Sequence, residues 1–160
     1  NLLNRTSSMA RKWFDDAVPP AGSDAGPEHP IAQQASQTIS IVLSRMPELS
    51  FKAGAEAILQ LAIAANGHLN DTAPWSRMKQ PGQEDVVAND LYVVLEAARI
   101  VGVLLSPLLP ELSARILAQL GIDAVNGPWK DQLRWGGLTS GSVLPKPNPV
   151  MQRLELEEPL

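Results

Sequence analysis

The 160-residue sequence has no cysteine, and this absence excludes several kinds of chemistry. Without a thiol, the chain forms no disulfide, binds no metal through thiolates and has no cysteine nucleophile. Histidine is scarce as well: the two histidines, His29 and His68, lie far apart in the sequence, and neither has a second ligand nearby. We therefore expect no metal site. We also expect His29 to be solvated, because it lies in a proline-rich segment.

The sequence also lacks an excess of basic charge and a long apolar run. Its net charge is −4 at pH 7, whereas a non-specific nucleic-acid binder presents a broad basic surface. Any contact with RNA must therefore be local, and we expect no binding to DNA. Glu96 and Arg99 interrupt the longest apolar stretch, so we expect no membrane-spanning helix and no membrane partner. The chain starts at Asn1 without a signal peptide, and we expect it to be a piece of a longer protein.

Aromatic residues are few, at 4% of the chain, although 44% of all residues are hydrophobic. The core must then consist mainly of Leu, Ile, Val and Ala, and of these Leu and Ala favour helices. Apolar residues recur at helical spacing over 1–17, 31–46, 51–69, 84–105 and 110–120, and no segment alternates strongly enough to build a sheet. The predicted fold class is all-α, a bundle of about five helices.

The prediction for domain organisation is a single domain, 1–160, in two parts. Residues 1–120 form the helical bundle, and residues 121–160, rich in Gly and Pro, form an irregular tail that packs back on it and ends in a short helix. The expected anchors of the tail are Trp129, Trp135 and Leu144. For the two central helices, spacing places on the core side Phe51, Ala55, Ile58, Leu59, Ala62 and Ile63, then Val87, Leu91, Val94, Leu95, Ala98, Val101 and Leu105.

Sequence patterns for catalysis are missing. There is no Gly-rich phosphate-binding loop and no Ser-His-Asp arrangement at a recognisable spacing. Two carboxylate pairs, 15–16 and 84–85, stand at predicted helix ends, where surface charge explains them better than acid–base chemistry. We assign no catalytic residue.

The segment NDTAPW, residues 70–75, allows a binding role to be considered. A tryptophan in a turn is often a lid on the core, and it can equally be an exposed platform on which an unpaired base stacks. The preceding Pro74 would fix the backbone that presents the ring and reduce the entropy lost on binding. From these residues alone, both interpretations of Trp75 stay open.

The first fourteen residues contain Arg5, Arg11 and Lys12 and no acid, a small basic island in an acidic chain. Asn1, Arg5, Ser8 and Lys12 follow one another at helical steps, so they share one stripe of the predicted first helix. Such a stripe is commonly a solvated face. Asn and Arg also supply a bifunctional amide and a forked guanidinium, which suit base edges and phosphates.

Four stretches together resemble one family. In order and spacing, NLLNRTSSMARKWF, AANGHLNDTAPW, LLSPLLPELSARILAQLG and WGGLTSGSVLPKPNPVMQRLELEE are similar to the carboxyl-terminal part of methionyl-tRNA synthetases, and they extend over nearly the whole chain. The sequence departs from the family at 17–30, which matches no motif, and at Gly67–His68, where a Lys- or Arg-Tyr pair is expected. The latter change weakens any phosphate contact there.

The resemblance implies a helical domain that reads CAU, the anticodon of methionine tRNA. It places the Asn and Arg of the opening helix and the Pro-Trp of the later turn against the anticodon, with the Trp75 ring stacked on the first base. Asn4 and Asn70 are added because they are close to these positions. The implied anticodon-binding residues are Asn1, Arg5, Pro74, Trp75, Asn4 and Asn70.

The family's catalytic signatures, His-Ile-Gly-His and Lys-Met-Ser-Lys-Ser, do not occur in these residues. The resemblance therefore implies no cofactor here, and ATP use in a catalytic domain elsewhere in the parent chain. The implied partners are methionine tRNA, through its anticodon loop, and the enzyme's own N-terminal catalytic domain, and the implied location is the cytoplasm. The alternative is a helical scaffold module that has lost RNA reading and contacts proteins instead.

Overall fold

A computed structural model describes residues 2–123 and 127–151. Within these ranges the chain forms six α-helices, one of them a single turn, and two short 3₁₀ helices. The described residues form no β-strand, and one isolated antiparallel bridge pairs Ala17 with Val143. The all-α prediction is confirmed. In chain order the elements are α1 (Leu2–Trp13), η1 (Ser23–Ala25), α2 (Pro30–Arg45), α3 (Phe51–Thr72), α4 (Pro74–Arg77), α5 (Glu84–Leu105), α6 (Pro110–Ala118) and η2 (Trp129–Leu133).

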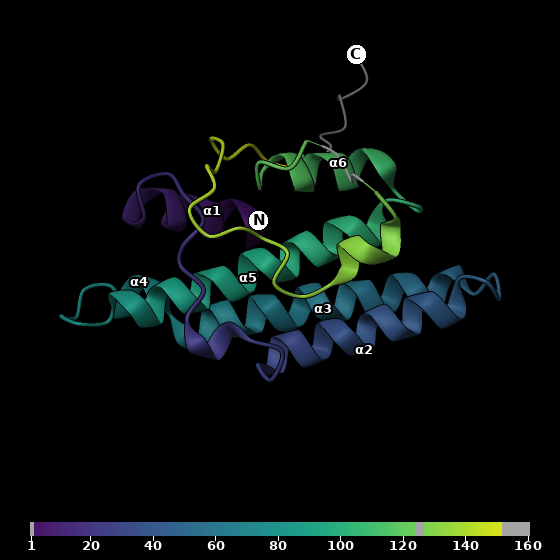
Figure 1. Ribbon diagram of the computed structural model, residues 1–160, viewed down its shortest axis with the longest axis horizontal. Coiled ribbons are helices and arrows are strands. Elements are labelled where there is room, and N and C mark those ends of the chain that lie inside the picture. Colours follow the sequence, from purple (N-terminus) through teal and green to yellow (C-terminus); the bar gives the residue numbers. More distant parts are fainter. Residues whose placement is uncertain (1, 124–126, 152–160) are drawn as a thin grey trace, which may run out of the picture.

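Helix α5 is the centre of the bundle. Helices α2 and α3 form an antiparallel pair on one side of it, and α1 and α6 lie on the other side (Figure 1). The predicted bounds of α5 agree with the structure. The prediction buried only one face of this helix, whereas a helix covered on both sides is buried nearly all round. Four of its predicted core residues are buried (Val87, Leu91, Val94 and Leu95), three are partly buried (Ala98, Val101 and Leu105), and others such as Tyr92, Val93 and Ala97 join the core.

Helix α3 turns a different face to the core from the one predicted. Phe51, Leu59 and Ile63 are 48%, 57% and 52% exposed, so they lie on the outer side. The segment is apolar almost all round, and its pattern could not decide between two stripes. The face chosen by the fold contains small residues that let the neighbouring helices approach closely. Its buried residues are Gly54, Ile58, Leu61, Ala65 and Leu69, of which the prediction named only Ile58.

Helix α1 is shorter than predicted, ending at Trp13 instead of residue 17. Asp15 and Asp16 have positive φ angles of 52° and 57°, and this left-handed conformation, which Asp tolerates better than most residues, stops the helix. Its buried face consists of Leu3, Thr6, Ser7 and Ala10. The predicted apolar stripe, with Met9 and Trp13, is only partly buried beside that face.

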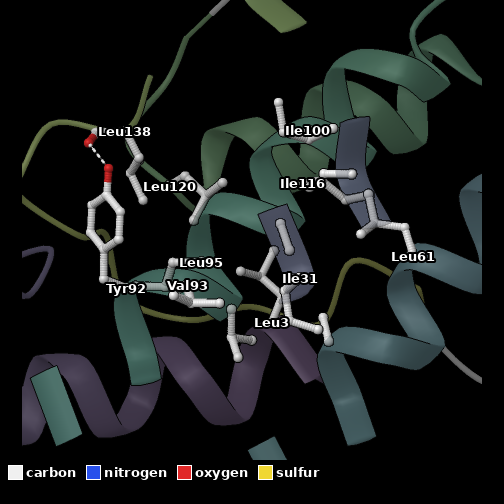
Figure 2. Close-up of a cluster of buried hydrophobic side chains, with 14 of the residues drawn as sticks. Leu3, Ile31, Leu61, Tyr92, Val93, Leu95, Ile100, Ile116, Leu120 and Leu138 are labelled. Carbon is white, nitrogen blue, oxygen red and sulfur yellow. Dashed lines mark hydrogen bonds between the residues drawn. The ribbon is translucent and has the colours of Figure 1, made fainter. Parts of the chain in front are cut away.

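The described part of the tail packs back on the bundle as predicted. The indole Nε1 of Trp129 donates to the Val103 carbonyl at 2.9 Å, and that of Trp135 donates to the Ala25 carbonyl at 2.7 Å. Leu144 is 1% exposed. Figure 2 shows a further tie, in which the Tyr92 hydroxyl on α5 points to the Leu138 carbonyl and donates a hydrogen bond of 2.9 Å. The short helix predicted at the end of the tail lies outside the described residues.

A buried ion pair completes the connection between α5 and the tail. Glu96 is fully buried and Arg99 is 4% exposed; Arg99 donates to both carboxylate oxygens at 2.8 and 2.7 Å. The carboxylate also accepts from the backbone N–H groups of residues 136, 137 and 138 at 2.8–3.0 Å. The guanidinium donates to the carbonyls of residues 132 and 134 at 2.6 and 2.7 Å. Each of the two buried charges is therefore paired with the other and hydrogen-bonded to the backbone of the tail, as the burial of a charge requires.

Candidate functional site

The turn that presents Trp75 lies between α3 and α5. Helix α3 was predicted to end near Leu69 but continues to Thr72, so Asn70 belongs to its last turn and not to a loop. Ala73 then has φ 44° and ψ 58°, and this left-handed residue reverses the chain into α4. Pro74 is the first residue of α4, where its fixed φ suits a helix start and its missing N–H is no loss.

Trp75 is on the surface of this turn. Its exposed fraction is 38%, whereas the preceding Pro74 is buried. The ring is therefore not a lid sealed into the core, and the interpretation as an exposed platform is supported. The buried Pro74 anchors the turn, so that the backbone that carries the indole is fixed before any ligand arrives.

Arg5, far away in the sequence, comes to the same place. The Cζ atom of Arg5 lies over the Trp75 ring, 5.4 Å from its centroid, a cation–π arrangement. Arg5 Nη2 also donates a hydrogen bond to Oδ1 of Asn70. At 3.5 Å this bond is long and therefore weak. The structure thus assembles a guanidinium, an amide and an indole on one exposed patch, although 65 residues separate Arg5 from Asn70 in the sequence.

The other predicted site residues are placed less directly. Asn4 precedes Arg5 on α1, and its amide oxygen is buried without a hydrogen-bond partner among the described residues. Asn1 lies outside the described residues. The structure therefore brings together three of the six predicted residues, Arg5, Asn70 and Trp75. A fourth, Pro74, is buried in the same turn.

A charged cluster behind the turn was not predicted. Asp90 on α5 is 5% exposed, and Nη1 of Arg77, on α4, donates to its Oδ2 at 3.3 Å. His68 Nε2, on α3, faces Oδ1 of Asp90 at 3.4 Å without making a hydrogen bond. The three residues stand on three different helices, so no sequence spacing relates them. The available signal was the aspartate itself, in the apolar segment NDLYVVLEAARI, because a buried acid requires a partner.

His29 joins this cluster, and the prediction that it is solvated was wrong. Its ring meets that of His68 edge to face, with centroids 5.0 Å apart. Its Nδ1 accepts a hydrogen bond of 3.1 Å from the Ile31 N–H and so caps the start of α2. Two histidines and one aspartate do not make a metal centre here: within 2–123 and 127–151, no three His, Asp or Glu residues gather where they could hold a metal ion.

The cap makes the stability of α2 sensitive to acid. Burial, and then the neighbouring His68, lower the pKa of His29 below its ordinary value, and the smaller effects of Asp90 and Asp24 oppose this. The unfolded chain therefore binds the proton more readily than the folded one, and we expect stability to fall as the pH drops below about 6.5. A protonated Nδ1 can no longer accept a hydrogen bond from the Ile31 N–H, so protonation of His29 also removes the cap of α2.

The test is urea denaturation at pH 7.5 and pH 5.5 for the parent and for His29→Asn. Asparagine is a good N-cap that does not titrate. The parent should lose more stability than His29→Asn between the two pH values. Equal losses would mean that His29 does not carry the acid sensitivity.

The patch of Arg5, Asn70 and Trp75 combines groups that nucleic-acid-binding surfaces use. An exposed indole offers a stacking face to an unpaired base, the amide can pair with a base edge, and the guanidinium suits a phosphate or a base. The family model described as "Anticodon binding domain of methionyl tRNA ligase" matches residues 18–159. The chain belongs to this family. The matched range contains the Trp75 turn and begins after α1, which carries Arg5.

Relatives of this anticodon-binding domain are themselves methionine–tRNA ligases. That of Synechocystis sp. is 36% identical over 167 residues, covering 98% of this chain and 31% of the relative. That of Bacillus subtilis is 32% identical over 163 residues, covering 99% of this chain and 24% of the relative.

Solved structures agree. The apo form of Mycobacterium tuberculosis methionyl-tRNA synthetase has a TM-score of 0.87 at 29% identity and covers 98% of this chain and 32% of that one. The same enzyme in complex with methionyl-adenylate has a TM-score of 0.85 at 30% identity, over 96% of this chain and 30% of that one. The chain thus spans about a third or less of the length of these relatives. None of the helices in the part that the structure describes is long and apolar enough to cross a membrane.

Proposed function

We propose that this domain reads the CAU anticodon of methionine tRNA as part of a methionine–tRNA ligase. The observation that carries the proposal is the meeting of Arg5, Asn70 and Trp75 on one exposed patch. These three residues were chosen from the sequence because they match, or lie beside, the residues that face the anticodon in the family. Their contact across three helices supports the choice.

In this proposal each group has a physical role. The first anticodon base leaves the loop and stacks on the Trp75 ring, whose backbone is held in place by the buried Pro74 that precedes it. Arg5 lies over the same ring in the free protein, so its charge is within reach of the nucleotide that arrives there. Asn1, at the start of the same helix, is proposed as a further contact, with Asn4 as a weaker candidate.

The ligase reaction itself is assigned to another part of the parent chain. We propose that a catalytic domain outside these residues uses ATP to activate methionine, acts in the cytoplasm, and receives the tRNA that this domain has selected. We propose no cofactor for the domain itself. The net charge of −4 keeps its contact with RNA local and weak in isolation. Contacts of basic side chains with phosphates make the binding sensitive to salt.

The test is a titration of the full-length protein with an RNA stem-loop that carries CAU, compared with the same stem-loop carrying A or G as the first anticodon base. CAU should bind more tightly than both changed loops, and the affinity for all three should fall with added salt. Equal binding of the three loops would overturn the proposal and favour a helical scaffold that no longer reads RNA.

A further inference from the structure

Asp90 is an acid that anticodon reading, as proposed above, leaves unexplained. It is 5% exposed in the most buried helix of the bundle, and its carboxylate meets two basic side chains from two other helices. Only one partner of the Asp90–Arg77 pair is buried, since the Arg77 side chain is 38% exposed. Such a pair is weak evidence for stability. What such a pair does supply is a fixed orientation of the elements that it joins.

The elements joined here are the two sides of the Trp75 turn. His68, which faces Oδ1 of Asp90 at 3.4 Å, precedes Asn70 by two residues on α3. Arg77, which donates to Oδ2 at 3.3 Å, follows Trp75 by two residues on α4. One carboxylate on the rigid central helix thus reaches both arms of the segment that carries the exposed amide and indole.

The turn has need of such support. Ala73 has a left-handed φ of 44°, a conformation that costs a non-glycine residue free energy and persists only where the surroundings impose it. Helix α4 has four residues, too few to be stable by itself. Its backbone hydrogen bonds are those of a single turn, from the N–H groups of residues 76, 77 and 78 to the carbonyls of residues 73 and 74.

We propose that Asp90 is a positioning residue for the anticodon-reading patch: its carboxylate binds Arg77 and faces His68, and it thereby fixes the turn that presents Trp75 and Asn70. Asp90 touches no RNA and acts only through these neighbours. The inference rests on the proposed reading of CAU by Trp75, and it adds a residue on α5 that determines how well the ring is placed.

The first experiment uses Asp90→Asn in the full-length protein, which keeps the size of the side chain and removes its charge. Affinity for the CAU stem-loop should fall about threefold to tenfold, a fraction of what stacking on an aromatic ring contributes. In a Trp75→Ala background the same substitution should change the affinity by less than about twofold, because only the smaller of the two positioned groups, the Asn70 amide, remains. An unchanged affinity for Asp90→Asn, or an equal fold-loss in both backgrounds, would overturn the inference.

Glu48→Gln is the matched control. It also removes a carboxylate charge from an Arg–carboxylate pair, Arg45–Glu48 at 3.0 Å, but that pair is exposed and stands in the connection of α2 to α3. This connection lies at the opposite end of the helix pair from α4 (Figure 1). The control should bind the CAU loop as the parent does.

A second readout separates failure of this inference from failure of the proposed function. Amide hydrogen exchange of residues 76–78 should be faster in Asp90→Asn than in the parent and unchanged in Glu48→Gln, since those amides close the turn of α4. If the parent does not distinguish the stem-loops, the proposed function fails, and the exchange rates alone decide whether Asp90 fixes the turn. Unchanged rates would then contradict the positioning role.

Discussion

Replacing Trp75 with alanine should weaken binding of the CAU stem-loop by about 5- to 150-fold, the equivalent of about 1–3 kcal/mol for one stacked base. The melting temperature should change little, because the ring is 38% exposed and contributes less to the core than a buried aromatic residue does. Fluorescence anisotropy of a labelled stem-loop at low salt measures the first quantity, and thermal unfolding followed by circular dichroism measures the second.

Two variants control for the loss of an aromatic side chain. Trp75→Phe keeps a ring in the turn and should retain most of the affinity. Trp135→Phe changes a tryptophan of the tail, removes its hydrogen bond to the Ala25 carbonyl and should cost about 1 kcal/mol of stability while leaving RNA binding unchanged. A Trp75→Ala protein that binds the CAU loop as tightly as the parent would refute the assigned role of the ring.

Substituting Glu96 with glutamine should lower the free energy of unfolding by about 3–5 kcal/mol, because it leaves the Arg99 charge buried without its partner. In a chain of this size the melting temperature should fall by about 6–20 °C. The loss is large because one carboxylate serves five hydrogen bonds, two from Arg99 and three from backbone N–H groups of the tail.

Glu111→Gln is the matched control for this prediction. Glu111 also pairs with an arginine on its own helix, Arg115 at 3.7 Å, but its side chain is 89% exposed. An exposed pair of this kind contributes little to stability, so the free energy of unfolding of the control should stay within about 0.5 kcal/mol of that of the parent. If Glu96→Gln were as stable as Glu111→Gln, the tail would not depend on the buried pair.

The sequence was sufficient for the fold class and for most helix bounds, because helical periodicity and proline breaks are local signals. It was insufficient for the buried face of α3, where Phe51, Leu59 and Ile63 fit a core stripe as well as Leu61 and Leu69 do. Only the positions of α2 and α5 decide between the two stripes. Local pattern cannot contain that information.

The site shows the same division. Trp75 and Arg5 were chosen because the segments that contain them resemble a family, and the structure places their side chains in contact. Asp90 and its neighbours His68 and Arg77 were missed, since their relation exists only after three helices have packed. His29 was misjudged for the same reason: its proline-rich surroundings suggested solvent, but the fold turns its ring against His68.

The most direct measurement of the central claim places a fluorescent cytosine analogue at the first anticodon position of the stem-loop. Emission of the analogue depends on what its ring stacks against, so it reports the surroundings of that one base. Saturating amounts of the parent should change its emission, and saturating amounts of Trp75→Ala should not. The same change with both proteins would show that the first base does not stack on Trp75 and would contradict the account.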